Sequence, residues 1–125
     1  MPSPANDLTN KIINEFYLAG AFSWRAESAG VFDKQKGIYR TAPKKGVADI
    51  LAVYKGIFIA IEVKIGKDRL SPEQDGFLKN IQHAGGYSGI ASTFDEFKVW
   101  WFKTKVFIDD RLSTWRRNRK VYTYQ

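Results

Sequence analysis

Residues 46–65, GVADILAVYKGIFIAIEVKI, carry the clearest structural pattern in this sequence. In the second half of this stretch, β-branched apolar residues occupy every other position: Ile57, Ile59, Ile61, Val63 and Ile65. Strict alternation of this kind is typical of a β-strand with one face in the core. Residues 47–54 are apolar on both faces except at Asp49, which is typical of a central strand. Because Lys55-Gly56 between the two runs suits a tight turn, we expect a β-hairpin.

The length of the turn determines which residues of the two strands face each other. With a two-residue turn, Tyr54 pairs with Ile57, and counting back places Asp49 opposite Glu62. A four-residue loop centred on the same turn gives the same pairing, whereas a three-residue loop would break it. Directly opposed residues share a face, with Cβ atoms about 4.5–5.5 Å apart. The hairpin therefore predicts two adjacent carboxylates, with Lys64 two residues further along the same face.

This trio of charged residues favours one kind of chemistry. Two opposed carboxylates repel each other unless a cation lies between them, and Mg²⁺ prefers carboxylate oxygens as ligands. A nearby ammonium group can orient water or stabilise the charge that develops on a phosphorane. The pattern therefore indicates a metal-dependent phosphodiesterase centre. The alternative interpretation is a solvent-exposed Glu62–Lys64 pair, with Asp49 merely ending a strand.

The composition limits the class of protein. The chain has 125 residues, of which 44% are hydrophobic and 15% aromatic, so we expect residues 1–125 to form a single domain. There are no cysteines, which excludes disulfides, thiolate zinc sites and cysteine nucleophiles. The first ten residues lack a signal-peptide pattern, and no apolar run approaches about 18 residues. We expect a cytoplasmic protein that does not associate with membranes.

The net charge of +7 is distributed unevenly. Residues 31–45 carry five basic and one acidic side chain, and residues 98–125 carry eight basic and two acidic ones. The hairpin region between these segments is mildly acidic, as expected for a metal site beside a polyanion. Solvation of a loop and a tail is the alternative explanation for the basic segments. The candidate nucleic-acid-binding residues are Arg25, Lys34, Lys36, Arg40, Lys44, Lys45, Arg116, Arg117 and Arg119.

Three segments precede the hairpin. Apolar residues at helical spacing predict a helix over 7–19, with Asp7 as its N-cap. Bulky alternating residues predict a strand over 21–26. The Gly, Pro and Lys content of residues 28–45 predicts a long irregular connection.

After the hairpin, Ser71-Pro72-Glu73-Gln74 predicts a helix start with a capping box, and Gln74 could also point toward Glu62. A strand over 87–92 and a helix beginning near Thr93 follow. The basic tail from residue 103 suits either backbone contact with nucleic acid or an amphipathic helix docked on the domain. The expected element order is α-β-β-β-α-β-α, so we expect an α/β fold with a mixed β-sheet flanked by helices.

The segments GVADI, IEVK and LSPEQ, together with a helix that ends at Gly85-Gly86, resemble the VRR-NUC branch of the PD-(D/E)XK nuclease superfamily. Archaeal Holliday-junction resolvases share the same restriction-endonuclease-like core. The resemblance covers about residues 8–97 and leaves a basic extension, about 98–125, outside it. It implies an endodeoxyribonuclease that uses Mg²⁺ or Mn²⁺, from a bacterial cell or a phage-infected host.

The resemblance also implies a substrate class and an assembly. Small members of the family often cut branched DNA and form dimers, so the implied substrate is a Holliday junction or a flap. A homodimer would suit a symmetric junction. Trp100 and Trp101 could lie at such an interface, with packing in the core as the alternative.

The resemblance implies a role for each residue of the motif. Asp49 and Glu62 match the two acidic metal ligands, and the backbone carbonyl of Val63 would be a third. Lys64 matches the catalytic lysine, which positions or activates the attacking water. Gln74 matches a glutamine of the following helix that usually faces the site.

One position departs from the family pattern. The first helix of the family usually supplies a glutamate as a further metal ligand, but the best match here falls near Asn10. Glu15 lies five residues further on, roughly 140° around the helix. Either Asn10 acts as a neutral ligand or Glu15 acts in a shifted register. The missing acid also supports a rival hypothesis, a non-catalytic nucleic-acid-binding module. A weaker hypothesis is an adaptor domain that recruits a partner through its C-terminal helix.

Overall fold

The computed structural model describes the backbone of residues 3–26, 31–40 and 46–118, and side chains over 3–26, 34–37 and 46–114. The main elements follow the order expected from the sequence. They are α1 (Pro4–Leu18), β1 (Phe22–Arg25), β4 (Ile50–Tyr54), β5 (Ile57–Val63), α2 (Pro72–His83), β6 (Tyr87–Ala91) and α3 (Phe94–Asn118).

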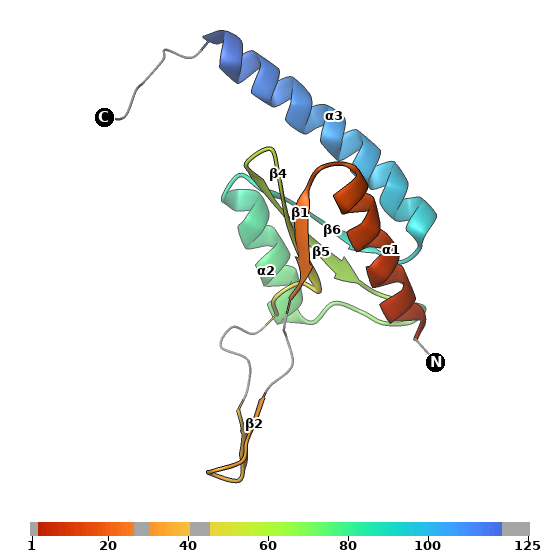
Figure 1. The fold of residues 1–125 in the computed structure, drawn as a ribbon, viewed down its shortest axis with the longest axis vertical. Helices are drawn as coiled ribbons and strands as arrows, with labels where there is room; N and C mark the ends of the chain where they lie inside the picture. Colours follow the sequence, from red (N-terminus) through yellow and green to blue (C-terminus); the bar gives the residue numbers. More distant parts are fainter. Residues whose placement is uncertain (1–2, 27–30, 41–45, 119–125) are drawn as a thin grey trace, which may run out of the picture.

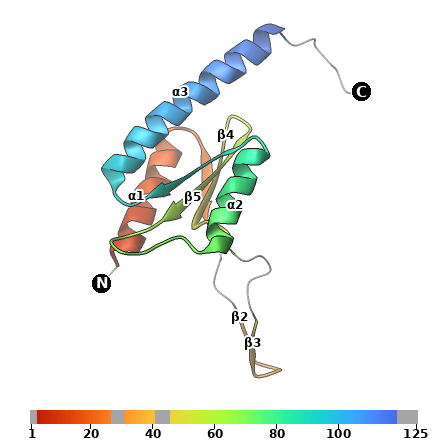
Figure 2. The ribbon, with the colours of Figure 1, turned by 180° about the vertical axis from the view of Figure 1, so that it is seen from behind.

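Four strands form a mixed sheet in the order β1-β4-β5-β6. The pairs β1–β4 and β4–β5 are antiparallel, and β5 and β6 are parallel. The helices α1 and α3 cover one face of the sheet, and α2 covers the other (Figures 1 and 2). The α/β class, the mixed sheet and the α-β-β-β-α-β-α order are therefore confirmed.

The register of the central hairpin is as predicted. Tyr54 pairs with Ile57, and Leu51 pairs with Ala60. Lys55 and Gly56 both have positive φ angles, of 50° and 82°, as a two-residue hairpin turn with the native twist requires. However, β4 begins at Ile50 and not at residue 47, so the ladder ends one residue before Asp49 reaches Glu62.

The two faces of the sheet bury two separate sets of side chains. On the α1 and α3 face, Ile50, Ile59 and Ile61 pack with aromatic residues that include Phe16 and Trp101. On the α2 face, a smaller cluster contains Ala48, Ala60 and Leu78. Because helices cover both faces, β5 is buried along most of its length.

The helix α3 is one continuous element of 25 residues, with no break near residue 103. Trp101, Thr104 and Ile108 of this helix are buried against the sheet and α1. Trp101 is only 1% exposed, so this residue packs in the core and does not lie at a protein interface.

Two further expectations need correction. The helix α1 begins at Pro4 with Ser3 as its N-cap, which leaves Asp7 inside the first turn. The connection over 28–45 contains a small hairpin, β2 (Val31–Asp33) and β3 (Ile38–Arg40), that extends away from the main sheet (Figure 1). Across the described ranges, no helix is both long and apolar enough to cross a lipid bilayer.

Candidate metal centre

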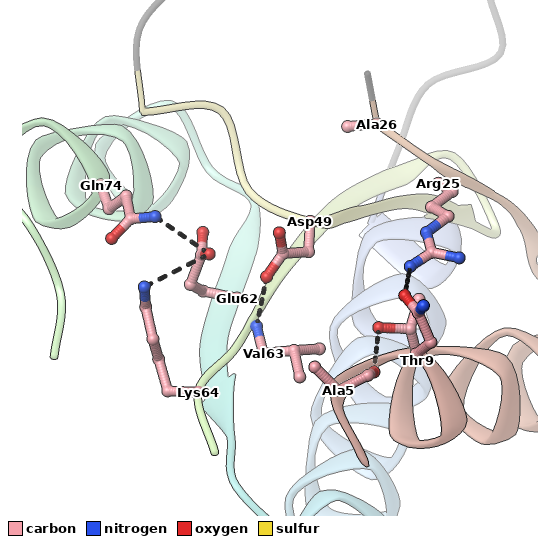
Figure 3. Close-up of a pocket in the computed structure, with 10 residues that line it drawn as sticks. Ala5, Thr9, Arg25, Ala26, Asp49, Glu62, Val63, Lys64 and Gln74 are labelled. Atoms are coloured by element: carbon pink, nitrogen blue, oxygen red, sulfur yellow. Dashed lines mark hydrogen bonds and ion pairs between the residues drawn. The ribbon is translucent and has the colours of Figure 1, made fainter. Parts of the chain in front are cut away.

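A cavity of about 310 Å³ lies at the end of the sheet where β4 begins (Figure 3). It brings together residues that are far apart in the sequence. The hairpin and α2 contribute Asp49, Glu62, Val63, Lys64 and Gln74, whereas α1, β1 and the residue after β1 contribute Ala5, Asn6, Thr9, Arg25 and Ala26. The four side chains with an implied catalytic role therefore all line one cavity.

Asp49 is held by the strands on both sides of it. Its Oδ2 accepts a hydrogen bond from the backbone N–H of Val63 at 2.8 Å, and its carbonyl accepts one from Ala26 at 2.9 Å. The side chain thus continues the β4–β5 ladder where the backbone pairing stops. This arrangement fixes the Asp49 carboxylate beside Glu62.

Glu62 is a charged residue in a buried position, with 1% of its surface exposed. Its Oε1 accepts a hydrogen bond from Gln74 Nε2 at 3.2 Å and lies 4.0 Å from Lys64 Nζ. Its buried Oε2 has no hydrogen-bond partner among the described residues. A solvent-exposed Glu62–Lys64 pair is therefore the wrong interpretation.

The electrostatic state of Glu62 follows from this burial. Loss of solvation, and then the neighbouring Asp49 carboxylate, raise the pKa of Glu62, and Lys64 acts in the opposite direction; together they bring this pKa to about 8. One lysine does not compensate two adjacent carboxylates. Without a cation Glu62 therefore keeps a proton at neutral pH, and a cation beside Asp49 and Glu62 would favour the ionised form of both carboxylates.

The first turn of α2 positions Gln74. The predicted capping box is present: Ser71 Oγ accepts from the Gln74 N–H at 3.1 Å, and Gln74 Oε1 accepts from the Ser71 N–H at 2.9 Å. The amide nitrogen of Gln74 is then directed at Glu62. Gly46 makes this possible, because a Cβ there would clash with the backbone carbonyl of Glu73.

The donor set at this end of the sheet fits a hard divalent cation. Carboxylate and carbonyl oxygens are the ligands of Mg²⁺, which commonly binds through one or two carboxylates and completes its shell with water and phosphate. The unpartnered Oε2 of Glu62 would coordinate a cation bound beside Asp49 and Glu62. Within the described part of the chain, no group of three or more His, Cys, Asp or Glu residues is placed to hold a metal ion, so Asp49 and Glu62 would bind one as a pair.

The first helix contributes different residues from those expected. Asn10 and Glu15 do not line the cavity; Asn6 and Thr9 lie there instead. The Thr9 hydroxyl donates to the Ala5 carbonyl at 2.8 Å, one turn back along the helix. The signal that could have identified Asn6 is Ser3-Pro4, a better helix start than Asp7, which moves the first turn of α1 into the cavity.

The candidate nucleic-acid-binding residues are spread over several segments. Arg25 lies at the cavity and donates a hydrogen bond to Asn6 Oδ1. Lys34 and Lys36 are exposed near the tip of the β2–β3 hairpin. Lys44, Lys45 and Arg119 lie outside the described residues. For Arg40, Arg116 and Arg117 the structure describes the backbone but not the side chain.

Comparison with known proteins gives a distant structural similarity. No family model and no curated protein matches the sequence. Among solved structures, the chain is similar to Hjc, a Holliday junction resolvase from the archaeal hyperthermophile Archaeoglobus fulgidus, with 24% identity and a TM-score of 0.49. The match covers 70% of this chain and 66% of that one, just under two thirds of its length. At this level of similarity an activity cannot be transferred, and the residues at the cavity have to indicate the function.

Proposed function

We propose that this chain is a Mg²⁺- or Mn²⁺-dependent endonuclease that hydrolyses phosphodiester bonds in DNA. The observation that supports this proposal most strongly is Glu62. A buried, ionised carboxylate with an unpartnered oxygen beside a second carboxylate is costly unless a proton or a cation neutralises it. Asp49 also joins the two strands, but the buried Glu62 beside it is the group that we interpret as evidence of a cation-binding site.

Each residue of the cavity has a role in this proposal. Asp49 and Glu62 would hold the ion, with the Val63 carbonyl as a further ligand. The bound ion supplies positive charge that lowers the pKa of a water and stabilises negative charge on the phosphoryl oxygens. Gln74 donates to Oε1 of Glu62 and so would leave Oε2 for a bound ion.

We assign to Lys64 the role of positioning or activating the attacking water. Its side chain is 16% exposed and lies at the cavity, where a poorly solvated ammonium group interacts strongly with developing negative charge. The water oxygen attacks phosphorus and the bond to the 3′ oxygen breaks. The attacking water gives up one proton to solvent and the 3′ oxygen takes up one from solvent, so the products carry a 5′-phosphate and a 3′-hydroxyl.

Branched DNA, such as a Holliday junction, is the substrate class we propose. This choice rests on the resemblance of the motifs around Asp49 and Glu62 and on the basic residues near the cavity and on the β2–β3 hairpin. A homodimer would present two such cavities to the two equivalent strands of a junction.

One observation supports a second candidate, a nucleic-acid-binding module without activity. The first helix places the neutral residues Asn6 and Thr9 at the cavity, where an acid would strengthen metal binding. Binding of DNA without cleavage under any divalent ion would identify this alternative.

The test is cleavage of supercoiled plasmid and of a four-way DNA junction in Mg²⁺ and in Mn²⁺. The wild-type chain should cut, and Glu62→Gln and Lys64→Ala should not. Glu96→Gln is the matched control, because Glu96 is an exposed glutamate on α3 away from the cavity. Equal cutting by the wild type and by both site variants would point to a contaminating nuclease and end the proposal.

A further inference from the structure

Arg25 approaches the cavity from the opposite face of the sheet to Glu62. Arg25 pairs with Ile50 in the β1–β4 ladder, and Ile50 is buried on the α1 face. Asp49, which precedes β4, lies beside Glu62 instead, with its Oδ2 accepting from the Val63 N–H. The cavity therefore wraps around the end of the sheet, with the carboxylates on one side and the guanidinium on the other (Figure 3).

The position of the Arg25 guanidinium depends on α1. Its Nη2 donates to Asn6 Oδ1, nineteen residues earlier in the chain. Asn6 is itself fixed in the first turn of α1, where its backbone N–H donates to Ser3 Oγ at 3.2 Å. The neutral amide thus orients the arginine without neutralising it.

Arg25 keeps its positive charge for a ligand. Among the described residues, Arg25 forms no ion pair with a carboxylate. Both Arg25 and Asn6 are exposed at the cavity rim, where a phosphate can reach them. Guanidinium groups match phosphate geometry and bind two of its oxygens at once.

We propose that Arg25, held by Asn6, binds the phosphate that is cleaved and takes the place of a second metal ion, so that each chain binds a single divalent ion. This inference rests on the proposed nuclease function. It explains why a neutral residue, and not an acid, lies at the cavity from α1. An aspartate at position 6 would form an ion pair with Arg25 and cancel the charge that holds the phosphate.

The first experiment measures DNA binding in Ca²⁺ as a function of salt concentration. Arg25→Ala should weaken binding by about tenfold and lower the salt slope by about one, the signature of one lost phosphate contact. Arg25→Lys should restore the slope but only part of the affinity, because lysine cannot bind two oxygens in a fork. Arg111→Ala is the matched control, since Arg111 donates to Gly85 at the other end of α2.

The second experiment tests the positioning role of Asn6. Asn6→Ala should weaken binding in the wild-type background and have no further effect in an Arg25→Ala background, because Asn6 acts through Arg25. Asn6→Asp should also weaken DNA binding, although it keeps the size of the side chain. Additive effects of Asn6→Ala and Arg25→Ala, or tighter DNA binding by Asn6→Asp, would overturn the inference.

The third experiment counts bound ions by titration calorimetry with Mn²⁺. The wild type and Arg25→Ala should each bind one ion per chain, and two ions per chain would contradict the inference. A wild type that binds no ion and cuts no DNA would instead refute the proposed nuclease function. If the wild type cuts DNA while Arg25→Ala keeps wild-type affinity and salt slope, the inference about Arg25 alone fails.

Discussion

The carboxylate of Asp49 accepts a hydrogen bond from the backbone N–H of Val63 at 2.8 Å, just beyond the last paired residues of the hairpin. One carboxylate oxygen is therefore used to join two strands, and the other remains for a ligand. The same side chain has a structural and a chemical role, and substitutions can separate the two.

Asp49→Asn should keep the fold and lose the metal. The asparagine carbonyl can still accept from Val63, and the loss of one charge relieves the repulsion with Glu62. Asp49→Ala removes the acceptor as well and should cost about 1–3 kcal/mol. Thermal unfolding in EDTA checks this: equal melting temperatures for Asp49→Asn and Asp49→Ala would contradict a role for the hydrogen bond to Val63.

The stability of the metal-free protein should fall as the pH rises. The pKa of Glu62 is raised from 4.5 to about 8 in the folded state, so the folded chain holds a proton that the unfolded chain has released. The stabilisation is complete below pH 4.5 and is lost progressively as the pH rises to about 8. Melting temperatures in EDTA between pH 5 and 8.5 should show the fall, and Glu62→Gln should flatten it. If Glu62→Gln melts with the same dependence on pH as the wild type, a group other than Glu62 is responsible for the fall.

Gly46→Ala should be far more damaging than Gly56→Ala. Both glycines have positive φ angles, of 78° and 82°, but nothing lies within 4 Å of a Cβ at Gly56. Gly56→Ala should therefore lower the free energy of unfolding only by the cost of placing alanine at a positive φ, about 1–2 kcal/mol. At Gly46 the new methyl group also meets the backbone of Glu73 and Gln74, which raises the cost to about 2–4 kcal/mol and displaces α2. Urea unfolding of the two variants measures the difference, and equal losses would mean that the contact with α2 is not tight.

The C-terminal half of α3 should depend on Ile108 for its attachment. Ile108 is fully buried, so Ile108→Ala should cost about 2–5 kcal/mol. The adjacent Asp109 forms an ion pair with Lys55 at 2.7 Å, but both side chains are nearly half exposed, and Asp109→Asn should cost much less. Denaturant unfolding distinguishes them. A larger loss in Asp109→Asn than in Ile108→Ala would mean that the ion pair, and not the core, holds the helix.

The hairpin and the start of α2 were predictable because their signals are local. A two-residue turn and a period of two are enough to set the register of the hairpin from Tyr54–Ile57 back to Ile50–Ile61. Ser71 and Gln74 form a capping box within four residues of chain, with no help from the rest of the fold.

The other side of the cavity depends on tertiary structure and was not predictable. Ser3 and Asp7 are both acceptable helix caps, and only a helix that begins after Ser3 has Asn6 in its first turn, at the cavity. The contact between Asn6 and Arg25 joins a helix to an edge strand, and no spacing in the sequence encodes it. The burial of Ile108 likewise results from the direction in which α3 crosses the sheet.

The most direct measurement of the central claim is Mn²⁺ binding by titration calorimetry to the wild type, Glu62→Gln and Glu96→Gln. We predict that the wild type and Glu96→Gln bind Mn²⁺ with the same affinity and that Glu62→Gln does not bind it measurably. Equal binding by Glu62→Gln and the wild type would show that the buried pair Asp49–Glu62 is not the metal site.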